Sequence, residues 1–203
     1  MISHKHNFFF VSVPKTGSSS VEIALRKYCI SMPPSKKHFT YDEYINNKED
    51  KELINFDYFS FAFVRNPFDR LVSQFFFSGR RFWNKYGLNQ GSFCFKNYVE
   101  KIVSKNIPFS SHRYESTKSN KLDKDWSQLQ FVSPNIDFIG KLENIQQDFD
   151  VVCDKIGIPQ QQLPHENKTA HRHYTEYYDD ETRKIVAEKC AKDIKYFGYK
   201  FGE

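Results

Sequence analysis

The sequence predicts an α/β fold in which helices cover both faces of a central, mainly parallel sheet, giving a three-layer α/β/α arrangement. Two observations lead to this prediction. Continuous apolar runs at 8–13, 59–64 and 136–139 have the character of strands that are buried on both faces. Each run leads, through a short polar loop or a glycine, into a stretch with apolar residues at helical spacing. Strands that alternate with helices in this way form parallel sheets.

The first strand ends at Pro14, and the helix after it is predicted from the spacing of Val21, Ala24, Leu25 and Tyr28. The second strand ends at Arg65. There Asn66 is a suitable N-cap and Pro67 occupies the first helical position. The predicted apolar stripe of this helix consists of Phe68, Leu71, Val72, Phe75 and Phe76.

The third strand leads through Gly140 into a helix near Asn144–Ile156. The last helix is predicted to start at Asp179 or Asp180. Its inward side carries Val186, Cys190, Ile194 and Phe197. Between the second and third pairs, 79–126 is polar and irregular apart from a predicted helix around Phe93–Ser104. Long segments of this kind are often functional.

Length, charge and cysteine content limit the kind of protein that this chain can be. Its 203 residues fit a single domain over 1–203. A net charge of +5 suits an anionic ligand but is too weak, without a basic stripe, to predict a nucleic-acid partner. No apolar run approaches the roughly 20 residues of a membrane span. The start has no signal-peptide cleavage pattern. Scattered cysteines, two of them in apolar helical patterns, indicate buried free thiols, so we expect a cytoplasmic protein without a membrane anchor.

The loop V-P-K-T-G-S-S-S-V-E, from Val13 to Glu22, has the chemistry of a phosphate cradle. A glycine between a strand and a helix permits a tight turn, and backbone N–H groups at a helix N-terminus favour anions. Lys15 adds a full positive charge, and the threonine and serines after it add hydroxyl groups. The donors considered are Lys15, Thr16, Gly17, Ser18, Ser19 and Ser20. The loop is not a Walker A motif, because the lysine precedes the glycine and no Gly-Lys-Ser/Thr is present. The alternative is a serine-rich N-cap with a solvated lysine.

The second loop, within F-A-F-V-R-N-P-F-D-R-L-V-S-Q-F, places Arg65 at a strand end and Ser73 two turns into a helix. An arginine fork and a hydroxyl can hold a terminal phosphate together. The alternatives are a salt bridge from Arg65 to Asp69 and a solvent-facing position for Ser73.

The two loops together resemble the nucleotide-binding motifs of sulfotransferases that use 3′-phosphoadenosine 5′-phosphosulfate (PAPS), particularly the carbohydrate sulfotransferase group called sulfotransferase family 2. P-K-T-G-S-S-S is similar to that family's 5′-phosphosulfate loop, and V-R-N-P-F-D-R-L-V-S-Q-F to its 3′-phosphate site. The resemblance implies a P-loop-like sheet. It also implies that Lys15 contacts the oxygen between phosphate and sulfate, while Arg65 and Ser73 hold the 3′-phosphate.

Weaker matches supply the remaining candidates. His38 lies between the two motifs and is a candidate general base, with Asp42 and Glu43 as alternatives. The stretch P-H-E-N-K-T-A-H-R-H-Y, 164–174, resembles the family's late cofactor loop, in which Lys168 and Thr169 are candidates. Its lysine and arginine make a metal site unattractive.

We therefore expect sulfuryl transfer from PAPS to an acceptor hydroxyl, with carbohydrate as the expected acceptor, no metal, and 79–126 as an acceptor-binding insertion. Lys15 and His38 are the expected catalytic residues. The alternatives are a non-catalytic nucleotide- or RNA-binding protein and a P-loop kinase-like phosphotransferase. The first would need aromatics on an exposed platform, and the second a magnesium-binding loop.

Overall fold

The computed structural model describes residues 1–29, 38–46, 57–85, 93–104, 109, 126–132, 134–164 and 171–203. Contacts divide the chain into two compact units. The first unit contains Met1–Arg65 and Gln128–Lys168, and the second contains Asn66–Ser127 and Thr169–Glu203. The motif loop at Arg65 thus lies where the chain passes from one unit into the other.

The first unit holds a four-stranded sheet in the order β1-β2-β3-β4. Its strands are β1 (Ile2–Ser3), β2 (Phe8–Val11), β3 (Phe59–Val64) and β4 (Phe138–Lys141). The pairs β2–β3 and β3–β4 are parallel, which confirms the predicted mainly parallel α/β architecture. The third strand starts two residues later than predicted. The short antiparallel edge strand β1 was not predicted.

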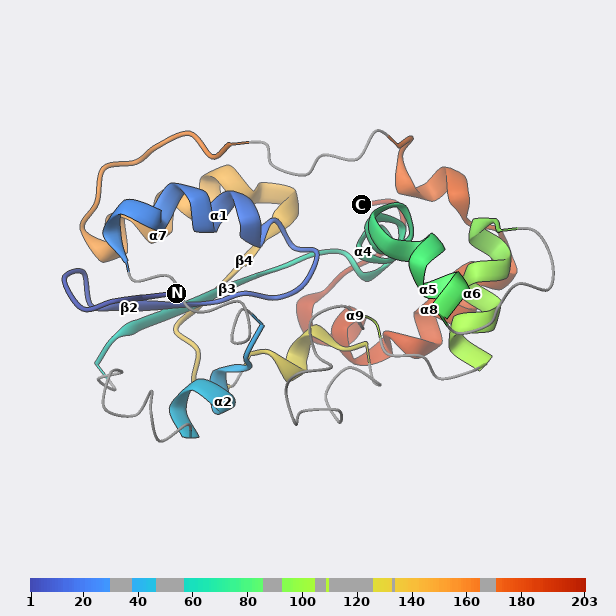
Figure 1. The fold of residues 1–203 in the computed structure, drawn as a ribbon, viewed down its shortest axis with the longest axis horizontal. Helices are drawn as coiled ribbons and strands as arrows, with labels where there is room; N and C mark the ends of the chain where they lie inside the picture. Colours follow the sequence, from blue (N-terminus) through green and yellow to red (C-terminus); the bar gives the residue numbers. More distant parts are fainter. Residues whose placement is uncertain are drawn as a thin grey trace. The chain divides into compact units, whose positions relative to one another are not determined.

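Helices cover both faces of this sheet, as Figure 1 shows for α1 (Ser18–Leu25), α7 (Ile145–Ile156) and α2 (Tyr41–Asn46). Side chains alternate along a strand, so successive phenylalanines of β2 face opposite ways. Phe8 and Phe10 belong to the core shared with α1 and α7, whereas the Phe9 ring packs on Tyr41 and Tyr44 of α2. The continuous apolar run therefore serves two cores at once.

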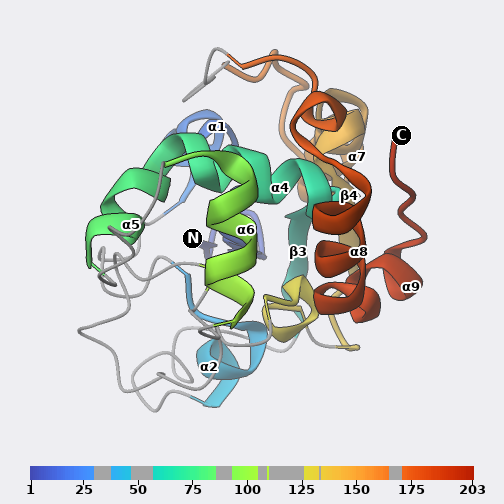
Figure 2. The same ribbon diagram turned by 90° about the vertical axis from the view of Figure 1, so that its right-hand side faces the viewer.

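The second unit is helical. Its helices are α4 (Pro67–Gln74), α5 (Arg80–Lys85), α6 (Phe95–Ser104), α8 (Asp180–Lys189) and α9 (Ala191–Phe197). Asn66 caps α4 as predicted, because its side chain accepts a hydrogen bond from the N–H of Phe68. Figure 2 shows α6 beside α8, and α4 contacts α8 as well. The predicted last helix is divided at Cys190 into α8 and α9.

The helix after β3 departs from the prediction beyond Gln74. Residues Phe75–Gly79 form a π-helix. A π-helical turn contains more residues than an α-helical turn, so the side chains of this stretch point in other directions than a continuous α-helix would give them. Phe68, Leu71 and Val72 are buried as predicted. The predicted inward position of Phe76 is wrong, because its side chain is 40% exposed after this shift.

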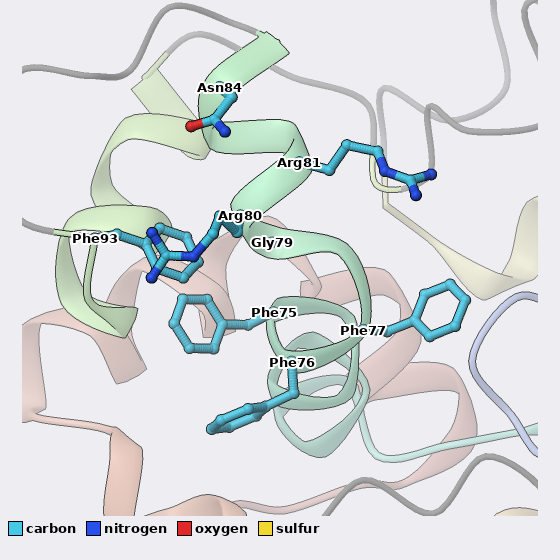
Figure 3. A pocket seen from close by; sticks show the side chains of 8 residues that line it. All are labelled: Phe75, Phe76, Phe77, Gly79, Arg80, Arg81, Asn84 and Phe93. Atoms are coloured by element: carbon cyan, nitrogen blue, oxygen red, sulfur yellow. The ribbon is translucent and has the colours of Figure 1, made fainter.

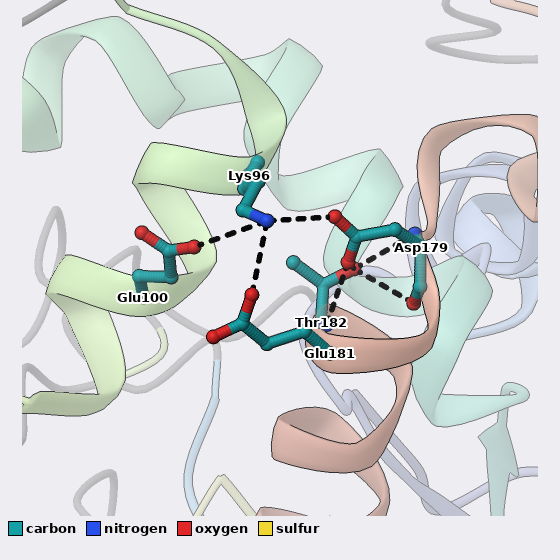
Figure 4. Close-up of polar contacts among 5 residues, drawn as sticks. All are labelled: Lys96, Glu100, Asp179, Glu181 and Thr182. Atoms are coloured by element: carbon teal, nitrogen blue, oxygen red, sulfur yellow. Dashed lines mark hydrogen bonds and ion pairs between the residues drawn. The ribbon is translucent and has the colours of Figure 1, made fainter.

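An exposed ionic network ties α6 to the start of α8 (Figure 4). Lys96 Nζ lies 3.0 Å from carboxylate oxygens of both Asp179 and Glu181 and 3.8 Å from Glu100. Asp179 also forms a capping box with Thr182. These hydrogen bonds hold the pKa of Asp179 well below its usual range and that of Lys96 above its usual range. The helix α6 is thereby anchored to the start of α8.

Cys153 and Cys190 are buried free thiols, as predicted. In the described parts of the chain, no helix has the length and apolar character needed to cross a membrane.

Candidate active site

The loop between β2 and α1 folds back onto the carbonyl of Val13. The hydroxyl of Thr16 donates to that oxygen at 3.0 Å, and the hydroxyl of Ser18 donates to it at 3.3 Å. Thr16 is fully buried. Because each hydroxyl has only one proton, these two side chains shape the loop in this structure. The groups that can meet an anion include the backbone N–H groups at the start of α1, the hydroxyl of the partly exposed Ser19 and the ammonium of Lys15.

Gly17 is the N-cap of α1 and has a left-handed backbone conformation, with φ of 78°. A Cβ at this position would lie 2.7 Å from terminal methyl carbons of both Leu142 and Ile145. These two residues follow β4, at the start of the segment that leads into α7. The glycine is therefore required twice, by the backbone angle and by the close packing of a neighbouring loop.

Three features make the position of Lys15 energetically unfavourable. Its own φ is 67°, an unusual value for a residue with a side chain. Burial, and then the nearby charge of Arg65, lower the pKa of its ammonium to about 8. Arg65 is held close, since its Nη1 donates to the Lys15 carbonyl at 3.3 Å. The structure thus brings Lys15 of the first loop and Arg65 of the second loop together.

Gln128 fixes the backbone of Arg65, a role that sequence reasoning missed. The Gln128 side chain accepts from the Arg65 N–H at 2.9 Å and donates to the Arg65 carbonyl at 2.8 Å. It is fully buried. This two-point amide contact continues β3 by one residue without a partner strand, and it holds the arginine where the strand ends. A buried glutamine 63 residues away carries no local pattern that could have revealed it.

His38 lies at the end of β2, against Ser12. Its Nδ1 is 2.8 Å from the Ser12 carbonyl oxygen. A carbonyl can only accept, so Nδ1 carries the proton, and in the neutral ring Nε2 is the basic nitrogen. The Ser12 hydroxyl in turn donates to a Glu22 carboxylate oxygen at 3.2 Å. Ser12, which was absent from the predicted site, therefore orients the ring of the predicted base through its backbone carbonyl.

The two alternative bases have other positions. Glu43 accepts from the Thr40 N–H at 2.8 Å, and Thr40 Oγ1 accepts from the Glu43 N–H at 3.0 Å, which is a capping box for α2. Asp42 is an exposed residue in the first turn of the same helix. Glu43 thus takes part in capping α2, whereas His38 contacts the backbone that follows β2.

The other predicted residues lie in the second unit or outside the described residues. Ser73 is on α4 and only 6% exposed, so the alternative of a solvent-facing position is wrong. Arg70 on the same helix is structural: its Nη1 donates to the Trp126 carbonyl at 2.8 Å and its guanidinium lies over the Phe109 ring. Lys168 and Thr169 fall outside the described residues, as does much of 79–126.

The described part of that segment contributes to a pocket. A cavity of about 500 Å³ is bounded by the π-helix and α5 (Figure 3). Its lining residues are Phe75, Phe76, Phe77, Gly79, Arg80, Arg81, Asn84 and Phe93. The ring of His171 stacks on Phe76 with 5.2 Å between centroids. The sequence prediction placed acceptor recognition in this segment but did not identify the pocket.

Comparison with known proteins agrees with the two motif loops, since residues 1–200 match the sulfotransferase family. The chain belongs to that family. Carbohydrate sulfotransferase 14 of Danio rerio is 23% identical to this sulfotransferase-family chain over 225 residues, which cover 98% of the chain and 61% of that protein. The chain thus spans less than two thirds of that relative's length.

A second relative is an uncharacterized protein of Archaeoglobus fulgidus, 28% identical over 142 residues, or 70% of this chain and 96% of that protein. No solved structure matches the chain significantly. Family membership therefore comes from the sequence match, which spans the Lys15 loop, the Arg65 loop and the buried Gln128 alike.

Replacing Gly17 by alanine tests the loop geometry of this sulfotransferase-family site. We expect Gly17→Ala to lower the free energy of unfolding by about 1–2 kcal/mol through its backbone angle alone. Displacement of Leu142 and Ile145 should add to that loss. Thermal or urea unfolding measures the total.

Gly157→Ala is the matched control. Gly157 also has a left-handed conformation, with φ of 68°, but a Cβ there would meet nothing within 4 Å. Gly157→Ala should therefore lower the free energy of unfolding only through its backbone angle. Equal losses for the two variants would contradict the proposed contact between Gly17 and the loop after β4.

Proposed function

We propose that this chain transfers a sulfuryl group from PAPS to an acceptor hydroxyl. The observation that carries the proposal is the meeting of Lys15 and Arg65, joined by the bond from Arg65 Nη1 to the Lys15 carbonyl. Two cations at the carboxyl ends of adjacent parallel strands, beside a glycine-capped helix, fit a ligand with more than one phosphate group. Membership of the sulfotransferase family supports PAPS as that ligand.

The loop between β2 and α1 would act as a P-loop-like cradle for the 5′-phosphosulfate. The N–H groups at the start of α1 and the ammonium of Lys15 would hold it. PAPS supplies an activated sulfuryl group that can pass to an oxygen nucleophile. Lys15 would stabilise negative charge that grows on the departing phosphate, a contribution larger in the transition state than in the ground state.

The 3′-phosphate would be bound by Arg65 with Ser73. Arg65 is positioned by Gln128 at the strand end. Ser73 is carried by α4, whose start is fixed by the Asn66 cap. An arginine fork is well suited to a terminal phosphate, because it can donate two parallel hydrogen bonds.

His38 would deprotonate the acceptor hydroxyl through Nε2. Its Nδ1–H is committed to Ser12, which fixes the tautomer that leaves Nε2 able to accept a proton. Lys168 and Thr169 remain candidates for the late loop over the nucleotide. A carbohydrate acceptor is supported by the Danio rerio relative's name, and 79–126 is the segment proposed to select it.

Binding of 3′,5′-adenosine bisphosphate beside 5′-AMP tests the function. A second phosphate held by Arg65 should strengthen binding by about 10- to 100-fold, the range for a charge-assisted hydrogen bond. Calorimetry measures both affinities, and Arg65→Ala should remove the difference. Equal affinities in the unaltered protein, or tighter binding of ATP with magnesium, would exclude PAPS as the natural ligand.

Lys15 should affect turnover more than binding. Lys15→Ala is expected to lower kcat by roughly 10²–10³, as for the loss of one preorganised donor. Binding of adenosine bisphosphate should change far less, because the loop N–H groups and Arg65 remain. Lys15→Arg should recover only part of kcat, since a planar fork does not replace a compact ammonium.

The pH dependence of binding gives an independent test of Lys15. Its pKa of about 8 means that the free protein loses this charge as the pH rises through that value. Adenosine bisphosphate should therefore bind more weakly above about pH 8. Lys15→Arg keeps its charge and should lack this step. An identical pH dependence in both proteins would show that another group titrates there.

A further inference from the structure

The pocket of the second unit differs chemically from the site of Lys15 and Arg65. It is formed along the π-helix and α5, and its volume of about 500 Å³ suits a small organic ligand (Figure 3). Phe76 and Phe77, on its border, are 40% and 57% exposed. Two adjacent large apolar side chains exposed around a cavity indicate a binding surface rather than ordinary exterior.

The pocket is also positively charged. Arg80 and Arg81 line it, both are exposed, and none of its eight lining residues is acidic. In the part of the chain that the structure describes, neither arginine forms an ion pair with a carboxylate. The Arg80 guanidinium instead lies 4.4 Å from the centroid of the Phe93 ring. Both positive charges are thus available to an anionic ligand.

The polar groups of the pocket argue against a ligand that is rich in hydroxyl groups. Such a ligand needs hydrogen-bond acceptors as well as donors, and arginine can only donate. Among the lining side chains, only the amide of Asn84 can accept. The exposed parts of Phe76 and Phe77, by contrast, offer apolar ring surface to another aromatic ring.

We propose that this pocket binds an aromatic anion, meaning a one- or two-ring aromatic group that carries a carboxylate, sulfate or phosphate. The ring packs on Phe77, which in Figure 3 points to the same side of the helix as Arg81, and the anionic group meets Arg81. Arg80, which points to the opposite side with Phe93, adds a second positive charge to the lining. The inference goes beyond the proposed transfer reaction, because it assigns this part of 79–126 to a ligand other than the proposed carbohydrate acceptor. It uses residues of the second unit only and does not depend on PAPS binding.

Calorimetry with 2-naphthoate and 2-naphthol tests this site, because the two probes share a ring system and differ in charge. The carboxylate should bind at least about tenfold more tightly, as expected for a charge-assisted contact to arginine. Arg81→Gln should remove most of that difference and leave the affinity for naphthol unchanged. Phe77→Ala should weaken both probes. Arg26→Gln, which replaces an exposed arginine of the first unit, is the matched control and should change neither affinity.

Three results would overturn the proposal. Equal affinities for naphthoate and naphthol would show that the arginines do not recognise charge. Tighter binding of a glucuronate-containing trisaccharide, sensitive to Arg81→Gln, would assign the pocket to an acidic sugar instead. Naphthoate binding that Arg81→Gln and Phe77→Ala both leave unchanged would place the ligand elsewhere. Adenosine bisphosphate titrated into the same variants keeps the two proposals separate, since its affinity should not depend on Arg81 or Phe77.

Discussion

The close contact of Gly17 with Leu142 and Ile145 is the constraint on which the candidate site depends. The chain leaves a buried strand and enters α1 within six residues, and the turn must leave the first N–H groups of the helix accessible. A left-handed glycine makes this turn possible. The two apolar side chains after β4 then occupy the volume that a Cβ would need. The loop is consequently held by the neighbouring parallel strand as well as by its own sequence.

Lys15 and Arg65 show how the same geometry prepares the site for an anion. Burial, and then the nearby charge of Arg65, lower the pKa of Lys15, so holding the two cations together in this partly buried place is unfavourable. The positive φ of Lys15 adds strain of the kind that gathers at functional sites. Gln128 and the Lys15 carbonyl nevertheless hold Arg65 in position. An anion between these groups would reverse the electrostatic cost, so the arrangement is explained best by a ligand that carries negative charge.

The sequence predicted those features that depend on short-range pattern. The three parallel strands, the Asn66 cap and the Lys15–Gly17 turn each have a local reason in neighbouring residues. The contacts that orient the site are different, because they join distant segments. Nothing around His38 indicates that its ring meets Ser12, and nothing around Gln128 indicates that its amide extends β3. Both depend on side chains that pack only after the sheet has formed. Local periodicity therefore could not have predicted either one.

The π-helix after α4 shows a second limit of periodicity, and a reason for its presence. Phe75 and Phe76 follow Leu71 and Val72 by four residues, so a continuous α-helix would bury both pairs on one side. The structure keeps Leu71 and Val72 in the core and leaves Phe76 and Phe77 exposed beside the pocket. An inserted π-turn achieves this change of phase without ending the helix, and such turns are frequent at functional sites. The core of the second unit requires apolar side chains of this run to be buried, whereas the pocket requires others to be exposed. The π-turn allows both within one helical stretch.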